Sequence, residues 1–160
     1  MANTFSARPQ DLELDLSNGA TDVFLDVLTL AGCAPAETPW EQHLVLHLGD
    51  AQQWGLGNAG FDLDDLPWTA GWPAEKAFLD RLIGLALTRH GWEQLPYDPP
   101  YALGYLTTFR EMVAGYTPVP AAAPEWGDWR VPPEPALITR CEPHRLFAGH
   151  FGCRLCNQFA

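Results

Sequence analysis

Residues 141–156 read CEPHRLFAGHFGCRLC, and this stretch decides how the C-terminal end of the chain folds. Cys141 and His144 form one pair with two residues between them, and Cys153 and Cys156 form a second. Structural zinc takes four tetrahedral ligands from Cys and His, and this spacing lets one tight turn present two of them to the same ion. Two glycines between the pairs allow the sharp bend that would bring them together. The pattern therefore predicts a hairpin that holds one zinc ion.

The two pairs resemble the turns of zinc-ribbon and zinc-knuckle modules, which are built from C-x2-C or C-x2-H turns. The resemblance covers residues 138–157 and implies a bound metal and a local fold. Such modules occur in proteins of many functions, so it implies no activity. We interpret residues 137–160 as a zinc-binding, ribbon-like element.

His150 is an alternative ligand because it stands in the same C-x2-H type of spacing to Cys153. His144 is favoured because it completes two symmetrical turns. A redox-active pair at Cys153 and Cys156 is a second alternative, and thiols that bind nothing are a third. Reactive C-x2-C pairs normally open a helix in a thioredoxin-like βαβ unit, which this sequence does not show.

Four protein ligands would complete the coordination of a zinc ion and leave no position for water or substrate, which is typical of structural sites. The zinc deaminase pattern, a His-x-Glu with a later Pro-Cys-x-x-Cys, is not matched. We therefore expect a structural zinc ion without catalysis at the metal. Cys33 has no local partner and is interpreted as a small, buried apolar residue.

Residues 118–136 contain six prolines, a composition that excludes the interior of a helix or a central strand. This segment is predicted to be a linker or an arm. Trp126 and Trp129 indicate that part of it lies on a surface, because two tryptophans in open solvent would forfeit much apolar burial.

Residues 1–117 have the pattern of an acidic, mainly helical body. The chain of 160 residues is 47% hydrophobic and 12% aromatic, which suffices to build a core. Apolar spacing and cap signals predict helices at about residues 20–32, 39–54, 73–90 and 98–114, and short strands at 11–16 and 92–97. The predicted fold class is α+β: a predominantly helical body with a few short strands and a C-terminal zinc-binding hairpin.

The charge of the chain is strongly acidic, with 9 basic and 20 acidic residues and a formal net charge of −11. No Lys or Arg occurs between Arg8 and Lys76, and the twelve acidic residues of positions 11–75 give that segment a charge of −12. Such a field repels nucleic acid and anionic membranes and attracts basic partners. A basic protein partner and simple solubility are the two interpretations that this charge leaves open.

The first residues, MANTFSARPQDLELDLS, lack the basic start and apolar run of a secretory signal. Apolar runs elsewhere are far shorter than the roughly 20 residues that span a bilayer. We expect a cytoplasmic protein without a membrane segment. Thiols stay reduced there, which favours metal binding over disulfides for the clustered cysteines.

His43 and His47 lie four residues apart, which would place both imidazoles on one face of a helix, as a second metal site requires. The Glu that follows the first His in zinc peptidases is replaced by Leu44. Two semi-buried histidines within the core are the preferred interpretation. The alternative is a metal-dependent enzyme whose site combines His43, His47 and His90 with the acidic loop. The acidic residues of that loop are Asp62, Asp64 and Asp65.

The leading hypothesis is a small acidic zinc-binding protein that acts as a protein-interaction or regulatory module, a class that includes toxin-neutralising immunity proteins. After the enzyme, the third hypothesis is a nucleic-acid adaptor, because Arg140, Arg145 and Arg154 give residues 138–160 a local charge of +2. The rest of the chain carries a net charge of −13, which repels the phosphate groups of a nucleic acid. A nucleic-acid partner is therefore disfavoured. We expect this element to dock on the chain's own acidic body or on a second copy, which leaves a homo-oligomer open.

Overall fold

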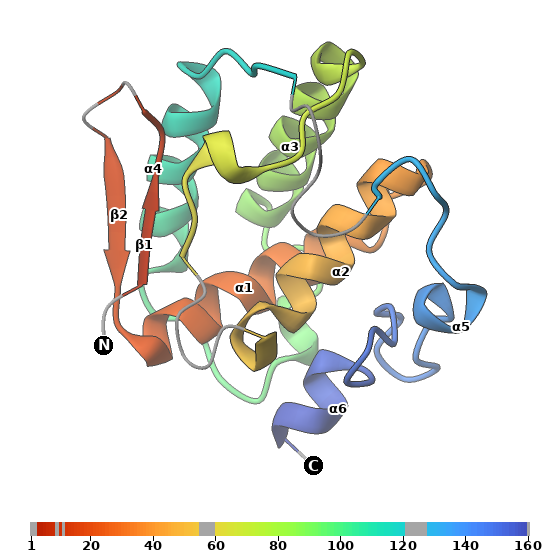
Figure 1. Ribbon diagram of the computed structural model, residues 1–160. Helices are drawn as coiled ribbons and strands as arrows, with labels where there is room; N and C mark the ends of the chain where they lie inside the picture. Colours follow the sequence, from red (N-terminus) through yellow and green to blue (C-terminus); the bar gives the residue numbers. More distant parts are fainter. Residues whose placement is uncertain (1–2, 9, 11, 55–59, 121–127, 160) are drawn as a thin grey trace.

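The computed structural model of the protein describes residues 3–8, 10, 12–54, 60–120 and 128–159 (Figure 1). It is mostly helical with one two-stranded sheet, so the predicted α+β class is confirmed. The elements are β1 (Asn3–Ser6), β2 (Glu13–Leu16), α1 (Asn18–Gly32), α2 (Pro39–Trp54), the 3-10 helix η1 (Leu63–Asp65), α3 (Trp72–Leu87), the 3-10 helix η2 (Trp92–Gln94), α4 (Ala102–Ala114), α5 (Pro135–Ile138) and α6 (Arg154–Phe159).

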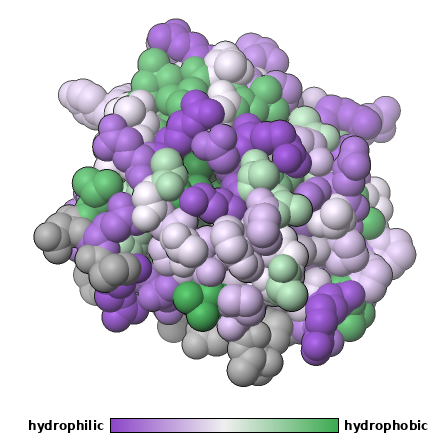
Figure 2. Space-filling view, turned by 90° about the horizontal axis from the view of Figure 1, so that it is seen from above, coloured by the Kyte–Doolittle hydropathy of each residue, from purple (hydrophilic) through white to green (hydrophobic). Residues whose placement is uncertain are grey.

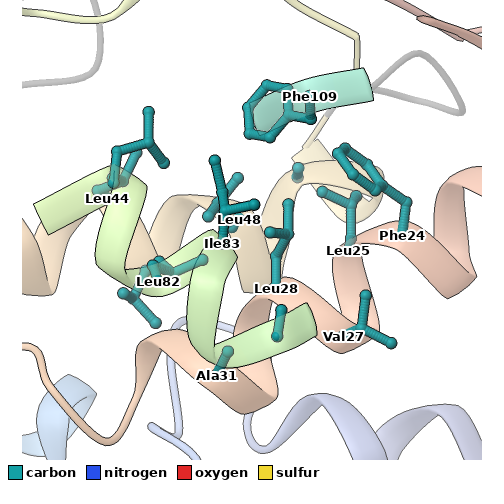
Figure 3. Close-up of a cluster of buried hydrophobic side chains, with 14 of the residues drawn as sticks. Phe24, Leu25, Val27, Leu28, Ala31, Leu44, Leu48, Leu82, Ile83 and Phe109 are labelled. Atoms are coloured by element: carbon teal, nitrogen blue, oxygen red, sulfur yellow. The ribbon is translucent and has the colours of Figure 1, made fainter. Parts of the chain in front are cut away.

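Helix α1 is the centre of the body, because it packs against α2, α3 and α4. Residues 24–32 of α1 are buried without interruption, so the second half of this helix is apolar on nearly every side. Side chains from all four helices meet around it in one hydrophobic cluster (Figure 3). The cluster includes Phe24, Leu25 and Leu28 of α1, Leu44 and Leu48 of α2, Leu82 and Ile83 of α3, and Phe109 of α4.

The β-hairpin covers one side of this helical core. β1 and β2 pair antiparallel, with Phe5 opposite Leu14, and the alternation of acid and Leu in β2 buries Leu14 and Leu16 while Glu13 stays exposed. Phe5 makes edge-to-face contacts with Phe24 and so joins the sheet to α1. The strand predicted at residues 11–16 is confirmed for Glu13–Leu16.

Residues 60–62 run along β1, and only a glycine fits at the closest approach. A Cβ atom on Gly60 would lie 2.2 Å from the carbonyl oxygen of Thr4, and the backbone of Ser6 donates a hydrogen bond to the Phe61 carbonyl at 3.0 Å. This is the extended part of the acidic loop. Its first residues, 55–59, lie outside the described part of the chain.

Helix α2 begins with the reciprocal hydrogen bonds of a capping box. The Thr38 hydroxyl accepts from the Glu41 backbone N–H, and the Glu41 carboxylate accepts from the Thr38 N–H, both at 3.2 Å. These bonds satisfy amides that have no partner within the helix. The helix predicted at residues 39–54 is confirmed with these bounds.

Near the end of α3, two elements of the structure differ from those that the sequence predicts. The helix ends at Leu87 instead of residue 90, because Arg89 takes a left-handed backbone conformation with a φ of 64°. The strand predicted at residues 92–97 is wrong. Gly91, with a φ of 79°, starts a 3-10 turn there, so Trp92 to Gln94 coil instead of extending.

The Pro-rich segment lies partly on the helical body. Trp129 is 2% exposed, and its ring centroid is 5.5 Å from that of Trp40 and 5.7 Å from that of His43. The predicted surface contact is therefore confirmed for Trp129, whereas Trp126 lies outside the described residues. The short helix α5 follows and contacts α2.

Candidate metal centre

Four potential ligand atoms meet near the C-terminus: the Sγ atoms of Cys141, Cys153 and Cys156 and a ring nitrogen of His144. All four lie within 4.8 Å of one another, so these residues could hold a metal ion. His144 Nδ1 lies 3.6 Å from Cys141 Sγ, 3.5 Å from Cys153 Sγ and 3.3 Å from Cys156 Sγ. The Sγ atoms of Cys141 and Cys156 are 3.6 Å apart.

Four of the six separations are close to the edges of a tetrahedron around an ion of the size of zinc. With Zn–S bonds of about 2.3 Å and Zn–N bonds of about 2.0–2.1 Å, a regular tetrahedron has S–N edges of roughly 3.6 Å and S–S edges of roughly 3.8 Å. The distances from His144 Nδ1 to the three sulfurs and the distance from Cys141 Sγ to Cys156 Sγ fall within a few tenths of an ångström of these values. The residues therefore fit an ion of this size and geometry.

The first ligand pair sits in a tight backbone turn. The Cys141 N–H donates to the Leu146 carbonyl and the Arg145 N–H donates to the Cys141 carbonyl, both at 2.7 Å. Arg145 closes the turn in a left-handed conformation with a φ of 63°. An antiparallel bridge between Arg140 and Phe147 joins the two sides of this turn. This turn lies within the first pair, whereas the prediction placed the bend of the hairpin between the two pairs.

The second ligand pair sits at the start of a helix, not in a second turn like the first. Cys153 directly precedes α6 and Cys156 lies inside it, and the Asn157 N–H donates to the Cys153 carbonyl at 3.0 Å. Gly152, with a φ of 80°, makes the bend that leads into this helix. The prediction of two symmetrical turns is thus wrong, because the second pair belongs to a helix. The four potential ligand atoms still converge.

Arg154, between the two cysteines of the second pair, is buried in the helical body. Its side chain is 4% exposed, and its Nε group contacts the carboxylate of Asp26, which is 1% exposed. Nη1 donates to the Gly49 carbonyl at 2.9 Å, and Nη2 donates to the carbonyl and carboxylate oxygens of Asp22 at 3.3 and 3.2 Å. The Tyr97 hydroxyl donates to the second Asp26 oxygen at 2.6 Å. The positive charge of Arg154 is therefore balanced by the carboxylates of Asp26 and Asp22.

The protonation of Asp26 follows from these contacts. Burial raises the pKa of the Asp26 carboxyl, while the Arg154 charge and the Tyr97 hydrogen bond act in the opposite direction. Asp26 can stay ionised at this depth only while Arg154 is beside it.

A second contact lies where the loop between the ligand pairs crosses the body. The His150 backbone N–H donates to the Asp50 carboxylate at 3.0 Å. Gly149 has a φ of 66°, and a Cβ atom there would lie 2.9 Å from an Asp50 oxygen. The Phe147 N–H donates to the Cys33 sulfur at 3.4 Å, and burial raises the pKa of Cys33 to about 11, so this thiol stays protonated. Cys33 is the buried small residue that the sequence predicted.

The expected docking of the C-terminal element on the chain's own acidic body is thus observed at Arg154. In Figure 1 the element lies below α2, with α6 beside the C-terminus. Two of its acidic partners, Asp26 and Asp50, are buried, whereas Asp22 is 40% exposed. Asp26 and Asp50, together with Asp62, are the buried acidic residues of the segment 11–75, with exposures of 1%, 4% and 5%.

His150, the alternative ligand, is exposed and does not belong to the cluster. Within the described ranges, Cys141, His144, Cys153 and Cys156 are the single group of three or more Cys, His, Asp or Glu residues placed to share an ion.

The histidines of the alternative enzyme hypothesis do not form such a group. His43 packs against Trp129, and burial lowers the pKa of His47 to about 4, so its imidazole is neutral near pH 7. His90 is exposed. Of the acidic loop, Asp62 accepts from Ser6 and Arg8, while Asp64 accepts from the Tyr116 hydroxyl. His43 and His47 are both partly buried, as the preferred interpretation of these two histidines predicts.

Comparisons with models of protein families, with curated proteins and with solved structures found no match. A proposal for this chain must therefore be argued from its own residues. Among the described residues, no helix is both long and apolar enough to cross a membrane.

The burial of Arg154 yields a quantitative prediction. Arg154→Met removes the partner of a buried carboxylate, which typically costs about 3–5 kcal/mol of unfolding free energy. Arg110→Met is the matched control, because Arg110 and its partner Asp80 are both 45% exposed and solvent screens such a pair, so its loss should cost far less. Urea unfolding of both variants measures the two losses. Equal losses would contradict the assignment of Arg154 as the anchor of the C-terminal element.

Proposed function

We propose that this protein is a zinc-stabilised acidic binding module. A structural zinc ion on Cys141, His144, Cys153 and Cys156 fixes the C-terminal element on the helical body, and the acidic surface of the body binds a basic protein partner. The observation that carries the proposal is the convergence of four potential ligand atoms next to Arg154, which is buried against Asp26.

The donor set supports zinc as the metal. Three thiolates and one imidazole are soft to borderline ligands, which select zinc over magnesium or calcium. The separations of the ligand atoms match a tetrahedron with zinc bond lengths.

A structural role is supported by the surroundings of the ligands. Four protein groups fill a tetrahedral ion, so no position remains for substrate. Three apolar residues between the ligands are buried: Leu146, Phe147 and Leu155 are 2%, 7% and 3% exposed. The ion would therefore hold together a small apolar contact that a segment of this length could not maintain alone.

A basic partner is supported by the exposed part of the acidic segment. Glu13 and Asp15 project from β2, and Glu37 is exposed elsewhere on the body. The segment between Arg8 and Lys76 supplies no positive charge to neutralise them. On the face shown in Figure 2, hydrophilic residues surround small groups of hydrophobic ones. A surface of this kind gains both association rate and selectivity from a positively charged partner.

Metal analysis tests the first half of the proposal. We expect one zinc ion per chain, lost in Cys141→Ser and in His144→Ala but retained in His150→Ala and in Cys33→Ala. Measurement is by mass spectrometry of metals after extensive dialysis. Retention of zinc in His144→Ala together with its loss in His150→Ala would show that the ligand set is wrong.

Binding of a fluorescent oligolysine peptide tests the second half. We expect the dissociation constant to rise at least tenfold between 50 and 300 mM salt, because exposed charges are screened. The pair Glu13→Lys and Asp15→Lys should weaken binding more than the pair Glu93→Lys and Glu134→Lys, which changes the same charge at exposed sites outside the acidic segment. Equal weakening would mean that net charge alone attracts the peptide, and would count against a defined acidic surface.

A further inference from the structure

We propose that Cys141 and Cys156 form a reversible disulfide when the protein meets hydrogen peroxide, and that this step releases the zinc ion. The inference rests on the metal site proposed above and assigns to it a second state. The juxtaposition that carries it is the 3.6 Å separation of the two sulfurs in a cluster that contains three thiols.

The selection of this pair follows from distance and exposure. A disulfide needs its sulfurs at about 2.05 Å, so Cys141 and Cys156 need to approach by roughly 1.5 Å. Both side chains are partly exposed, whereas Cys153 is 7% exposed and lies against the body. An oxidant from solvent therefore reaches the sulfurs of Cys141 and Cys156 before that of Cys153.

The two residues also belong to separate elements. Cys141 sits in the turn closed by the bridge of Arg140 and Phe147, and Cys156 sits in α6. A small movement of the short helix α6 brings the sulfurs together without opening that turn. Cys33, the fourth cysteine, is 1% exposed under the backbone of Phe147 and takes no part.

The chemistry balances with peroxide as the two-electron oxidant. The Cys141 thiolate attacks one peroxide oxygen, the O–O bond breaks, and the departing hydroxide takes a proton to become water, which leaves a sulfenic acid. The Cys156 thiolate then attacks the sulfenic sulfur, the S–S bond forms, and hydroxide leaves and is protonated to a second water. Two thiolates are oxidised and one peroxide is reduced.

The zinc ion is lost because the disulfide leaves too few ligands to hold it. The disulfide removes two of the four ligands, and His144 with Cys153 alone cannot hold zinc against dilution. A dithiol reductant reverses the step, because its thiolate attacks the disulfide and returns both cysteines to the metal. The site then alternates between a zinc-bound state and a disulfide-bound state.

The positions of the arginines make the disulfide readable by mass spectrometry. Trypsin cuts after Arg140, Arg145 and Arg154, so the three cysteines fall on three different peptides: residues 141–145, 146–154 and 155–160. Full-length zinc-loaded protein is treated with a small excess of peroxide, free thiols are alkylated, and the digest is analysed without reduction. A chromogenic chelator follows zinc in the same sample.

We expect peptide 141–145 to be joined to peptide 155–160, with one zinc ion released for each disulfide formed and rebound after dithiothreitol and zinc are added. Cys33→Ala should behave identically. A disulfide that involves peptide 146–154, or zinc that stays bound while the disulfide forms, would overturn the inference. The zinc content before oxidation tests the proposed function separately: a chain without zinc contradicts that function whatever disulfide it forms.

Discussion

The contact on which the C-terminal element depends is the burial of the Arg154 guanidinium between Asp26, Asp22 and the Gly49 carbonyl. A buried charge is tolerated only when its partners hold good geometry, and removal of either side leaves the other uncompensated. Arg154 keeps its position because it lies between Cys153 and Cys156, in the turn that the metal would fix. The metal site and the body are therefore linked through one side chain, and we regard them as one structural unit.

This link changes what the acidic composition means. The uninterrupted run of acidic residues suggests a uniformly negative surface, yet Asp26, Asp50 and Asp62 are buried and serve the fold. Asp26 and Asp50 receive the C-terminal element, whereas Asp62 joins the acidic loop to β1 through Ser6 and Arg8. The acidic residues available to a partner are those exposed on β2 and on the outer faces of the body. The sequence alone could not divide the two groups, because burial is a property of the fold.

The helices and the clustering of the four Cys and His side chains were predictable because each rests on local chemistry: apolar spacing, the capping box at Thr38 and Glu41, and paired Cys and His residues with two residues between them. The strand predicted at residues 92–97 failed because the left-handed backbone at Gly91 sets a tight turn there. The role of Arg154 was missed because its partners lie more than 100 residues away along the chain. The only local indication of the burial of Arg154 was its position beside Leu155, between Cys153 and Cys156.

The central claim is that metal binding holds the C-terminal element on the body through Arg154. Hydrogen exchange of the zinc-loaded and chelator-treated protein, read by mass spectrometry, tests it most directly, because amide protection reports local opening. We predict that zinc removal speeds exchange in residues 140–157 and also in α1 near Asp22 and in α2 near Gly49, while α3 and α4 stay protected. Faster exchange confined to residues 140–157 would contradict the claim, because amide protection in the helical body would then not depend on the metal.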